Sequence, residues 1–129
     1  MADPPPEPVL DEAEARQFRE GVRQFNEGYF FECHDTLEDL WGGLRGPSRD
    51  FFQGLIQVSV AFYHLTSDNA AGAESMLRRA LKRFAPYPAS YFGFDLDAHR
   101  QEIRDWLDRI GSGSAEALQA DFPRWVFRG

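Results

Sequence analysis

Cysteine is almost absent from this chain of 129 residues, since Cys33 is the only one. No disulfide can form within the chain, and the place of Cys33 in an apolar helical pattern indicates a small buried side chain. A chain without disulfides suits a reducing compartment, so we expect a cytoplasmic location. The opening segment, MADPPPEPVL, has neither a basic stretch nor an apolar run, so we expect no secretory signal.

Positive charge is scarce as well. The chain has 14 Lys and Arg residues against 21 Asp and Glu residues, which gives a formal net charge of -7. Nucleic acids and anionic membranes are bound through clustered basic side chains, so neither is an expected partner. The longest apolar run, GLIQVSVAFYHL, is too short to span a bilayer and includes Gln57 and His64. It predicts a core helix instead.

Apolar residues, by contrast, are abundant at 43% of the chain, and 15% of the chain is aromatic. This content predicts a folded chain with one core. Apolar side chains recur at helical spacing in five segments, which predict helices over about residues 11–27, 29–44, 48–66, 70–84 and 96–110. Ser48 and the segment TSDN are the expected N-caps of the third and fourth helices. PYPASYFGF, between the fourth and fifth helices, is expected to form a loop.

The expected fold is all-α, a compact antiparallel bundle of about five helices built from two helical hairpins plus a C-terminal helix. The third helix should lie at its centre, because it is apolar on nearly every side. Residues 1–10 are expected to form a flexible proline-rich arm, 11–110 a single helical domain, and 111–129 a Gly/Ser linker with an aromatic C-terminal tail. Phe122, Trp125 and Phe127 in this tail are costly to leave in water. The tail should therefore pack on the bundle or against a partner chain, and a homodimer is carried as one outcome.

Polar side chains interrupt the facing surfaces of the second and third helices. At helical spacing they form one stripe on each helix, with His34, Glu38 and Trp41 on the second and Gln53, Gln57 and His64 on the third. Antiparallel pairing about residue 46 should place Gln53 or Gln57 opposite the first stripe, with His64 further along, near the first turn of the second helix. Buried polar groups without partners cost about 1–3 kcal/mol, so these groups should bond to one another or to a ligand.

Three interpretations of this cluster stay open. It could be a hydrogen-bond network that fixes the helix register, a metal site with His34, Glu38 and His64 as ligands, or an acid-base or small-molecule site built on His34 and Glu38. An HExxH motif, a phosphate-binding glycine loop and a nucleophile elbow are all missing from the sequence, so it names no cofactor and no reaction, and no metal is expected. The favoured function is a binding or interaction module for a protein or small molecule; the alternative is a small enzyme, such as a metal-dependent hydrolase.

Other polar and aromatic residues are expected to be structural. The fourth helix should expose its basic residues to solvent, His99 should lie at the surface or the core edge, and two tyrosines at helical spacing should belong to the core. The residues so interpreted are Arg78, Arg79, Lys82, Arg83, His99, Tyr63 and Tyr87.

Four segments together resemble a prokaryotic family known as domain of unknown function 309. They are FNEGYFFECHDTLEDLW (25–41), FFQGLIQVSVAFYHL (51–65), DNAAGAESMLRRAL (68–81) and GFDL (93–96), and the resemblance runs from about Phe18 to Trp106. It implies a small all-α domain without an established activity, in which His34, Glu38, Trp41, Gln53, Gly54 and His64 are pattern positions. Asp68 departs from the pattern, because the family often has glycine there, so the backbone of the turn before the fourth helix is expected to differ.

Overall fold

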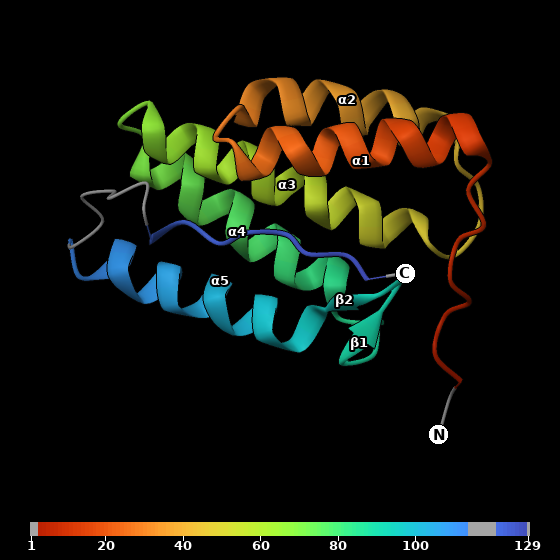
Figure 1. Ribbon diagram of the computed structural model, residues 1–129. Coiled ribbons are helices and arrows are strands. Elements are labelled where there is room, and N and C mark those ends of the chain that lie inside the picture. The colour runs from red at the N-terminus through yellow and green to blue at the C-terminus, as the bar shows by residue number, and fades with distance from the viewer. Residues whose placement is uncertain (1–2, 114–120, 129) are drawn as a thin grey trace.

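Five helices make up the fold in the computed structural model, which describes residues 3–113 and 121–128. They are α1 (Glu12–Asn26), α2 (Phe30–Gly43), α3 (Arg49–Thr66), α4 (Ala70–Phe84) and α5 (Leu96–Gly111), with two short strands, β1 (Ser90–Tyr91) and β2 (Phe94–Asp95), between α4 and α5. The expected all-α bundle of five helices is confirmed (Figure 1). No helix of the described residues is long and apolar enough to cross a membrane.

Side chains cap the starts of α1, α4 and α5, whereas α2 and α3 begin without a side-chain cap. Asp11 and Glu14 form a reciprocal capping box at the start of α1, and the side chain of Asn69 accepts a hydrogen bond from the backbone N–H of Gly72 at the start of α4. Ser48 occupies the expected N-cap of α3, but its side chain makes no capping bond. The backbone of Ser48 is already helical, and in this conformation the hydroxyl does not point at the N–H groups of the next turn. The prediction that the Ser48 side chain caps α3 is therefore wrong.

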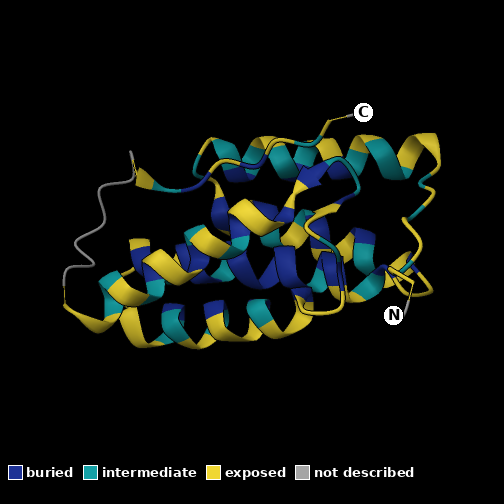
Figure 2. Ribbon diagram, turned by 90° about the horizontal axis from the view of Figure 1, so that it is seen from below, coloured by how far each residue is buried: buried dark blue, intermediate teal, exposed yellow. Residues whose placement is uncertain are grey.

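α3 lies at the centre of the bundle, as its sequence predicted. Eleven of its eighteen residues are buried, more than in any other helix that the structure describes. It packs against α2 on one side and α4 on another, while α1 covers α2 and α5 covers α4. Figure 2 shows the buried segments gathered in the middle of the bundle. The facing surfaces of α2 and α3 are therefore next to the core.

Gly54 allows α3 and α4 to approach closely. A β-carbon at this position would lie 2.5 Å from Cε1 of Phe84, whose ring is fully buried against the glycine. No carbon atom can be accommodated at that distance without displacing the ring. The resemblance named Gly54 as a pattern position, and the structure supplies a packing reason for glycine there.

The segment expected to be a loop before α5 contains a β-hairpin. β1 and β2 pair antiparallel, and the two residues between them, Phe92 and Gly93, both have positive φ, at 53° and 72°. This is the backbone of a type I′ turn, which favours Asn-Gly. Phe92 gave no turn signal for that reason, so the sequence indicated a loop and missed the two strands. The ring of Phe92 packs against Phe18 and Phe52, which offsets the unfavourable backbone.

The C-terminal tail packs on its own bundle, antiparallel to both α1 and α5 (Figure 1). Trp125 stacks on Phe25 with ring centroids 3.8 Å apart and an interplanar angle of 1°, and Phe127 stacks on Phe94. The amide of Asn26 accepts from the backbone N–H of Trp125 at 2.7 Å and donates to its carbonyl at 2.8 Å. Of the two expected outcomes for the tail, packing on the bundle is the one observed; residues 114–120 of the linker and tail lie outside the described residues.

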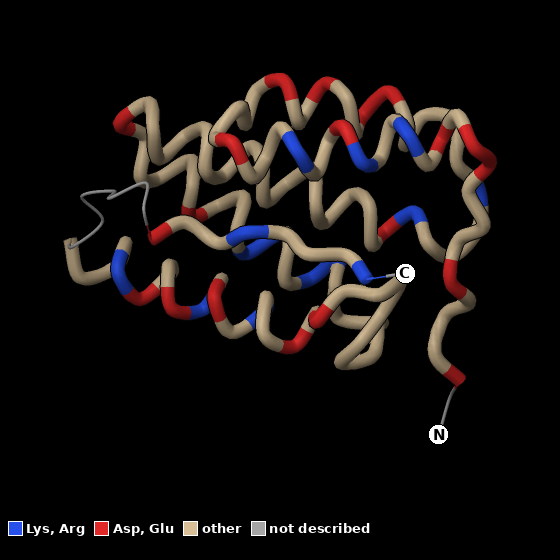
Figure 3. Tube along the Cα trace, in the orientation of Figure 1, with Lys and Arg blue, Asp and Glu red and all other residues tan. Residues whose placement is uncertain are grey.

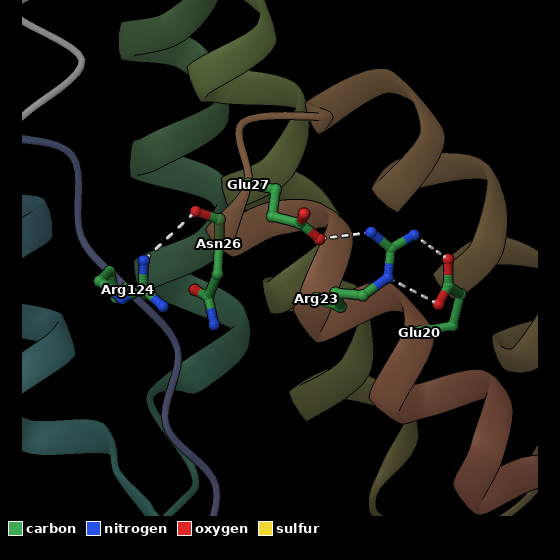
Figure 4. Close-up of polar contacts among 5 residues, drawn as sticks. All are labelled: Glu20, Arg23, Asn26, Glu27 and Arg124. Carbon is green, nitrogen blue, oxygen red and sulfur yellow. Dashed lines mark hydrogen bonds and ion pairs between the residues drawn. The ribbon is translucent and has the colours of Figure 1, made fainter.

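Charged residues form further polar contacts at the C-terminal end of α1, near Asn26 (Figure 4). Arg23 forms ion pairs with Glu20 and Glu27 along α1, and Arg124 of the tail donates to the carbonyl of Asn26 at 3.5 Å. The side chains of these ion pairs are about half exposed, so solvent screens the attraction and the pairs contribute little to stability. The aromatic stack and the Asn26 hydrogen bonds, rather than these charges, hold the tail.

Asp68, the residue that departs from the family pattern, has a φ of 57°. This is the left-handed conformation that glycine adopts freely, and the expected difference from the backbone of the family stays a prediction. Aspartate tolerates this region better than most residues, at a cost in strain.

Replacing Asp68 by glycine should therefore raise the free energy of unfolding by up to about 1 kcal/mol, because relief of strain outweighs the greater entropy of the unfolded chain. Asp68→Val is the matched control, since a β-branched residue is poorly tolerated at positive φ, and it should lower stability by about 1–2 kcal/mol. Urea denaturation of the two variants gives the comparison. A glycine variant less stable than the valine variant would contradict the strain argument.

Candidate functional site

His34 and Glu38 lie one turn apart on the outer side of α2. Nε2 of His34 is 2.6 Å from Oε2 of Glu38, and Nδ1 is 3.3 Å from Oδ1 of Asp35. The His34 side chain is 29% exposed and that of Glu38 is 56% exposed. The pair is thus a partly exposed contact between an imidazole and two carboxylates, open to solvent and to any partner that docks on α2.

The glutamines of α3 do not join this pair. Within the described residues, no hydrogen bond connects Gln53 or Gln57 to His34 or Glu38. Gln57 is buried, and its Oε1 has no hydrogen-bond partner among residues 3–113 and 121–128. The expected pairing of Gln57 with the polar groups of α2 is therefore not formed through this atom.

His64 lies at the far end of α3, where the expected register placed it. Tyr63, its neighbour, contacts the ring of Phe31 in the first turn of α2, with centroids 5.5 Å apart. Nδ1 of His64 is 3.4 Å from Nδ2 of Asn69, the residue that caps α4. His34, Glu38 and His64 therefore do not converge on one point, and the described residues hold no group of three or more His, Cys, Asp or Glu arranged to bind a metal ion.

Trp41 packs against Arg49 at the turn between α2 and α3. The Arg49 guanidinium stacks on its indole ring 3.9 Å from the centroid, and the indole N–H donates to the Arg49 carbonyl at 3.2 Å. Arg49 also donates to the carbonyls of Trp41 and Leu44 at the end of α2. These contacts set the α2–α3 register from one end, as the Phe31–Tyr63 contact does from the other.

Exposed aromatic rings lie beside the imidazoles. Phe31 is 51% exposed and Tyr63 is 39% exposed, and their rings contact His34 and His64, respectively. We call this surface the α2–α3 face and define it by Phe31, His34, Glu38, Tyr63 and His64. Large exposed apolar groups next to charged groups are typical of binding surfaces. Tyr63, interpreted from the sequence as a core residue, is thus partly exposed.

Negative charge is concentrated on α2, the helix that carries Phe31, His34 and Glu38 of the α2–α3 face. α2 carries Glu32, Asp35, Glu38 and Asp39, all exposed, and no lysine or arginine. Figure 3 shows these acidic positions along the outer edge of the bundle. A cationic partner would therefore find complementary charge and an aromatic surface together.

Other residues singled out from the sequence are structural. Burial raises the pKa of the Cys33 thiol to about 12, so it stays protonated and unreactive, as a buried filler should. Tyr87 is buried, in agreement with the sequence; its hydroxyl accepts from the backbone of Phe51 and donates to the carbonyl of Pro47. On α4, Arg78 pairs with Glu74 and Arg83 with Asp50, while Arg79 and Lys82 are exposed, as expected of a solvated face.

His99 is the clearest residue that sequence reasoning misplaced. It is 1% exposed, its ring contacts Phe84, Phe94 and Trp125, and its Nε2 has no hydrogen-bond partner in the described residues. The signal was present, because Leu96, His99, Ile103 and Trp106 recur at the spacing of one helical face and the other three are core residues.

Comparison with known proteins places the α2–α3 face inside a family segment. The model of the family described as Domain of unknown function (DUF309) matches residues 18–76. This segment is similar to that family. The resemblance found in the sequence is thereby confirmed as far as Met76, and every residue of the face lies within the match. The similarity of GFDL and of α5 to the family stays a prediction.

Two relatives are themselves uncharacterised. A protein of Aquifex aeolicus (strain VF5) is 26% identical over 98 residues, which cover 75% of this chain and 28% of the relative. The protein YpuF of Bacillus subtilis (strain 168) is 35% identical over 54 residues, which cover 41% of this chain and 31% of the relative. The matches thus span less than a third of each relative, so the similar segment occurs within longer proteins.

Proposed function

We propose that this DUF309 segment is an interaction module that binds a basic segment of a partner protein on the α2–α3 face. The observation that carries the proposal is the contact between Phe31 and Tyr63, two exposed rings, on the same face as the exposed carboxylates of Asp35 and Glu38, which lie beside His34. Aromatic rings supply contact area and accept cations on their faces, while carboxylates attract basic groups and set their orientation.

The exposure of His34 and Glu38 on the α2–α3 face supports a binding role over a purely structural one. The His34–Glu38 contact is partly exposed, so it contributes only about 0.2–1 kcal/mol to stability. Trp41 and Arg49 set the register of α2 and α3 at the turn, and the Phe31–Tyr63 contact sets it at the other end, so His34 and Glu38 are not needed for it. The face also lies in a segment that occurs within longer relatives, where a module that binds other chains would be useful.

The enzyme alternative rests on the His34–Glu38 pair alone. An imidazole beside a carboxylate can act as an acid-base pair. A site that also uses His64 would have to move this side chain away from Asn69 and along α3. Binding therefore requires no rearrangement of the described structure, whereas the three-residue hydrolase requires one.

The binding proposal predicts that an amphipathic helical peptide of leucine and lysine will bind the α2–α3 face, because lysine complements the acidic α2. In ¹H–¹⁵N NMR titrations, the amide signals of Phe31, His34, Tyr63 and His64 should shift. Phe31→Ala should weaken binding by about tenfold through loss of ring contact. Added salt should weaken binding further, since the attraction between exposed charges is screened.

Two controls make this experiment decisive. Tyr29→Ala removes another exposed aromatic ring of the same region that has no ring contact with the face, and it should leave affinity unchanged. A peptide with glutamate in place of lysine should not bind. Equal binding of the two peptides, or equal loss in the Tyr29 and Phe31 variants, would contradict the proposal. His34→Gln should stay folded, with a stability change below about 1 kcal/mol, so binding can be measured in it too.

A further inference from the structure

We propose a second binding site, a pocket away from the residues of the α2–α3 face, that takes a small organic carboxylate with an apolar body. The pocket has a volume of about 480 Å³ and is formed by four parts of the chain: the N-terminal arm, α1, the β1–β2 turn and the C-terminal tail. Figure 1 shows the arm, the hairpin and the tail at the end of the bundle where α1 begins. Its volume lies within the range of about 300–1,000 Å³ that is usual for small-molecule sites.

Most of the pocket wall is apolar. Leu10 of the arm, Phe18 and Val22 of α1, Phe92 of the turn and Phe127 of the tail all line it. Phe127 contacts Phe18 with ring centroids 4.7 Å apart and Phe92 with centroids 6.2 Å apart, so the aromatic part of the wall is one connected group. Such a wall favours an aliphatic or aromatic group of a ligand, through burial of apolar surface.

Two arginines stand at this apolar wall without anionic partners. Arg19 of α1 and Arg128 of the tail line the pocket, and within the described residues neither guanidinium makes an ion pair or a hydrogen bond. Arg23, Arg78 and Arg83 pair with carboxylates, whereas Arg16, Arg79 and Arg104, like Arg19 and Arg128, make no ion pair in the part of the chain that the structure describes. Guanidinium groups bind carboxylates in a planar, bidentate geometry. Glu7, the one acidic residue of the pocket lining, leaves a net positive charge there.

Backbone strain is a second, independent observation at the pocket. Phe92 has a φ of 53°, a conformation that bulky side chains rarely adopt, and its ring forms part of the wall. Gly93 beside it also has positive φ, and its carbonyl accepts a hydrogen bond from the backbone N–H of Arg128 at 2.8 Å. Strained residues recur at ligand sites, where the surrounding structure holds them in place. Here the strained turn joins one arginine to the aromatic wall.

The arm is held at the pocket as well. The Tyr91 hydroxyl of β1 donates to the carbonyl of Pro6 at 2.6 Å, which keeps Glu7 and Leu10 beside the hairpin. A ligand in the pocket would therefore contact both terminal segments of the described chain and α1 together. The chemistry of the lining selects a monocarboxylate with an aromatic or medium-length aliphatic body over a neutral or cationic analogue.

The test uses 3-phenylpropanoate as the probe and 3-phenylpropan-1-ol as its neutral counterpart, titrated into the full chain and followed by ¹H–¹⁵N NMR. The carboxylate should bind with a Kd below about 1 mM and shift the amides of Arg19, Phe92, Gly93 and Arg128, while the alcohol binds about tenfold more weakly. Arg19→Gln and Arg128→Gln should each reduce carboxylate affinity by about tenfold and leave alcohol affinity unchanged.

Arg16→Gln is the matched control, because Arg16 is an exposed arginine of α1 that does not line the pocket. It should bind the carboxylate as the unchanged chain does. Equal affinity for acid and alcohol, equal losses in the Arg16 and Arg19 variants, or no shift at these amides with several millimolar probe would each overturn the proposal. Phe31→Ala should leave carboxylate binding intact, so failure of this site and failure of the α2–α3 face can be told apart.

Discussion

Replacing Trp125 by alanine should lower the free energy of unfolding by about 3–5 kcal/mol, the range for loss of a large buried aromatic side chain. The indole is 1% exposed, stacks on Phe25 and contacts His99, so its removal leaves a cavity between α1 and α5. Its Nε1 has no hydrogen-bond partner in the described residues, so no hydrogen bond is lost with the ring. Urea denaturation followed by circular dichroism measures the change.

Val126, the next residue, provides the control for this experiment. It is 59% exposed, and Val126→Ala should change stability by no more than about 0.5 kcal/mol. Trp125→Phe should be far milder than Trp125→Ala, because a phenyl ring can keep the stack on Phe25. A loss below about 1 kcal/mol in Trp125→Ala would mean that the tail contributes little to the bundle.

Replacing Gly54 by leucine should be comparably damaging, with a loss of about 3 kcal/mol or more. The first side-chain carbon alone would lie 2.5 Å from the ring of Phe84, so α3 and α4 must move apart or the ring must leave its place. Leucine is a better helix former than glycine by about 0.8–1 kcal/mol, so the loss cannot come from helix propensity. Thermal and urea unfolding report it.

Gly42 separates the steric cause from a general intolerance of substitution. It lies within α2, and a β-carbon there meets nothing within 4 Å. Gly42→Leu should leave stability unchanged or raise it. Adding Phe84→Ala to the Gly54→Leu variant should restore part of the loss, because the two side chains then no longer compete for one space. Additive losses in that double variant would rule out the close approach as the cause.

Helical periodicity predicted the five helices and the central place of α3 because both depend on the spacing of apolar residues along the chain. The hairpin was missed because Phe92 occupies a position that normally shows asparagine, so the deciding information was packing of its ring rather than turn propensity. The tail posed a similar difficulty. Its three aromatic residues showed that burial was needed, but the partner, Phe25, is far away in sequence.

For the candidate site, the sequence predicted that α2 and α3 lie side by side but did not predict how exposed their polar side chains are. Antiparallel pairing of α2 and α3 correctly placed His64 near the first turn of α2. Helical spacing shows which residues share a helix face, but it does not show whether a neighbouring helix buries that face or leaves its edge exposed. His34 and Glu38 were therefore expected between α2 and α3, whereas both side chains are partly exposed to solvent. The pocket at Arg19 and Arg128 gave no signal, since its walls come from both ends of the chain.

The hydrogen bonds between Asn26 and Trp125 join residues 99 positions apart, which bears on how the chain acquires its structure during synthesis. The α1–α2 and α3–α4 hairpins consist of neighbours in sequence, so they can form while the ribosome is still adding later residues. The contact surface of Phe25 is then uncovered until Trp125 has emerged. Until that moment the nascent chain presents an apolar surface that a chaperone can recognise, and docking of the tail removes it.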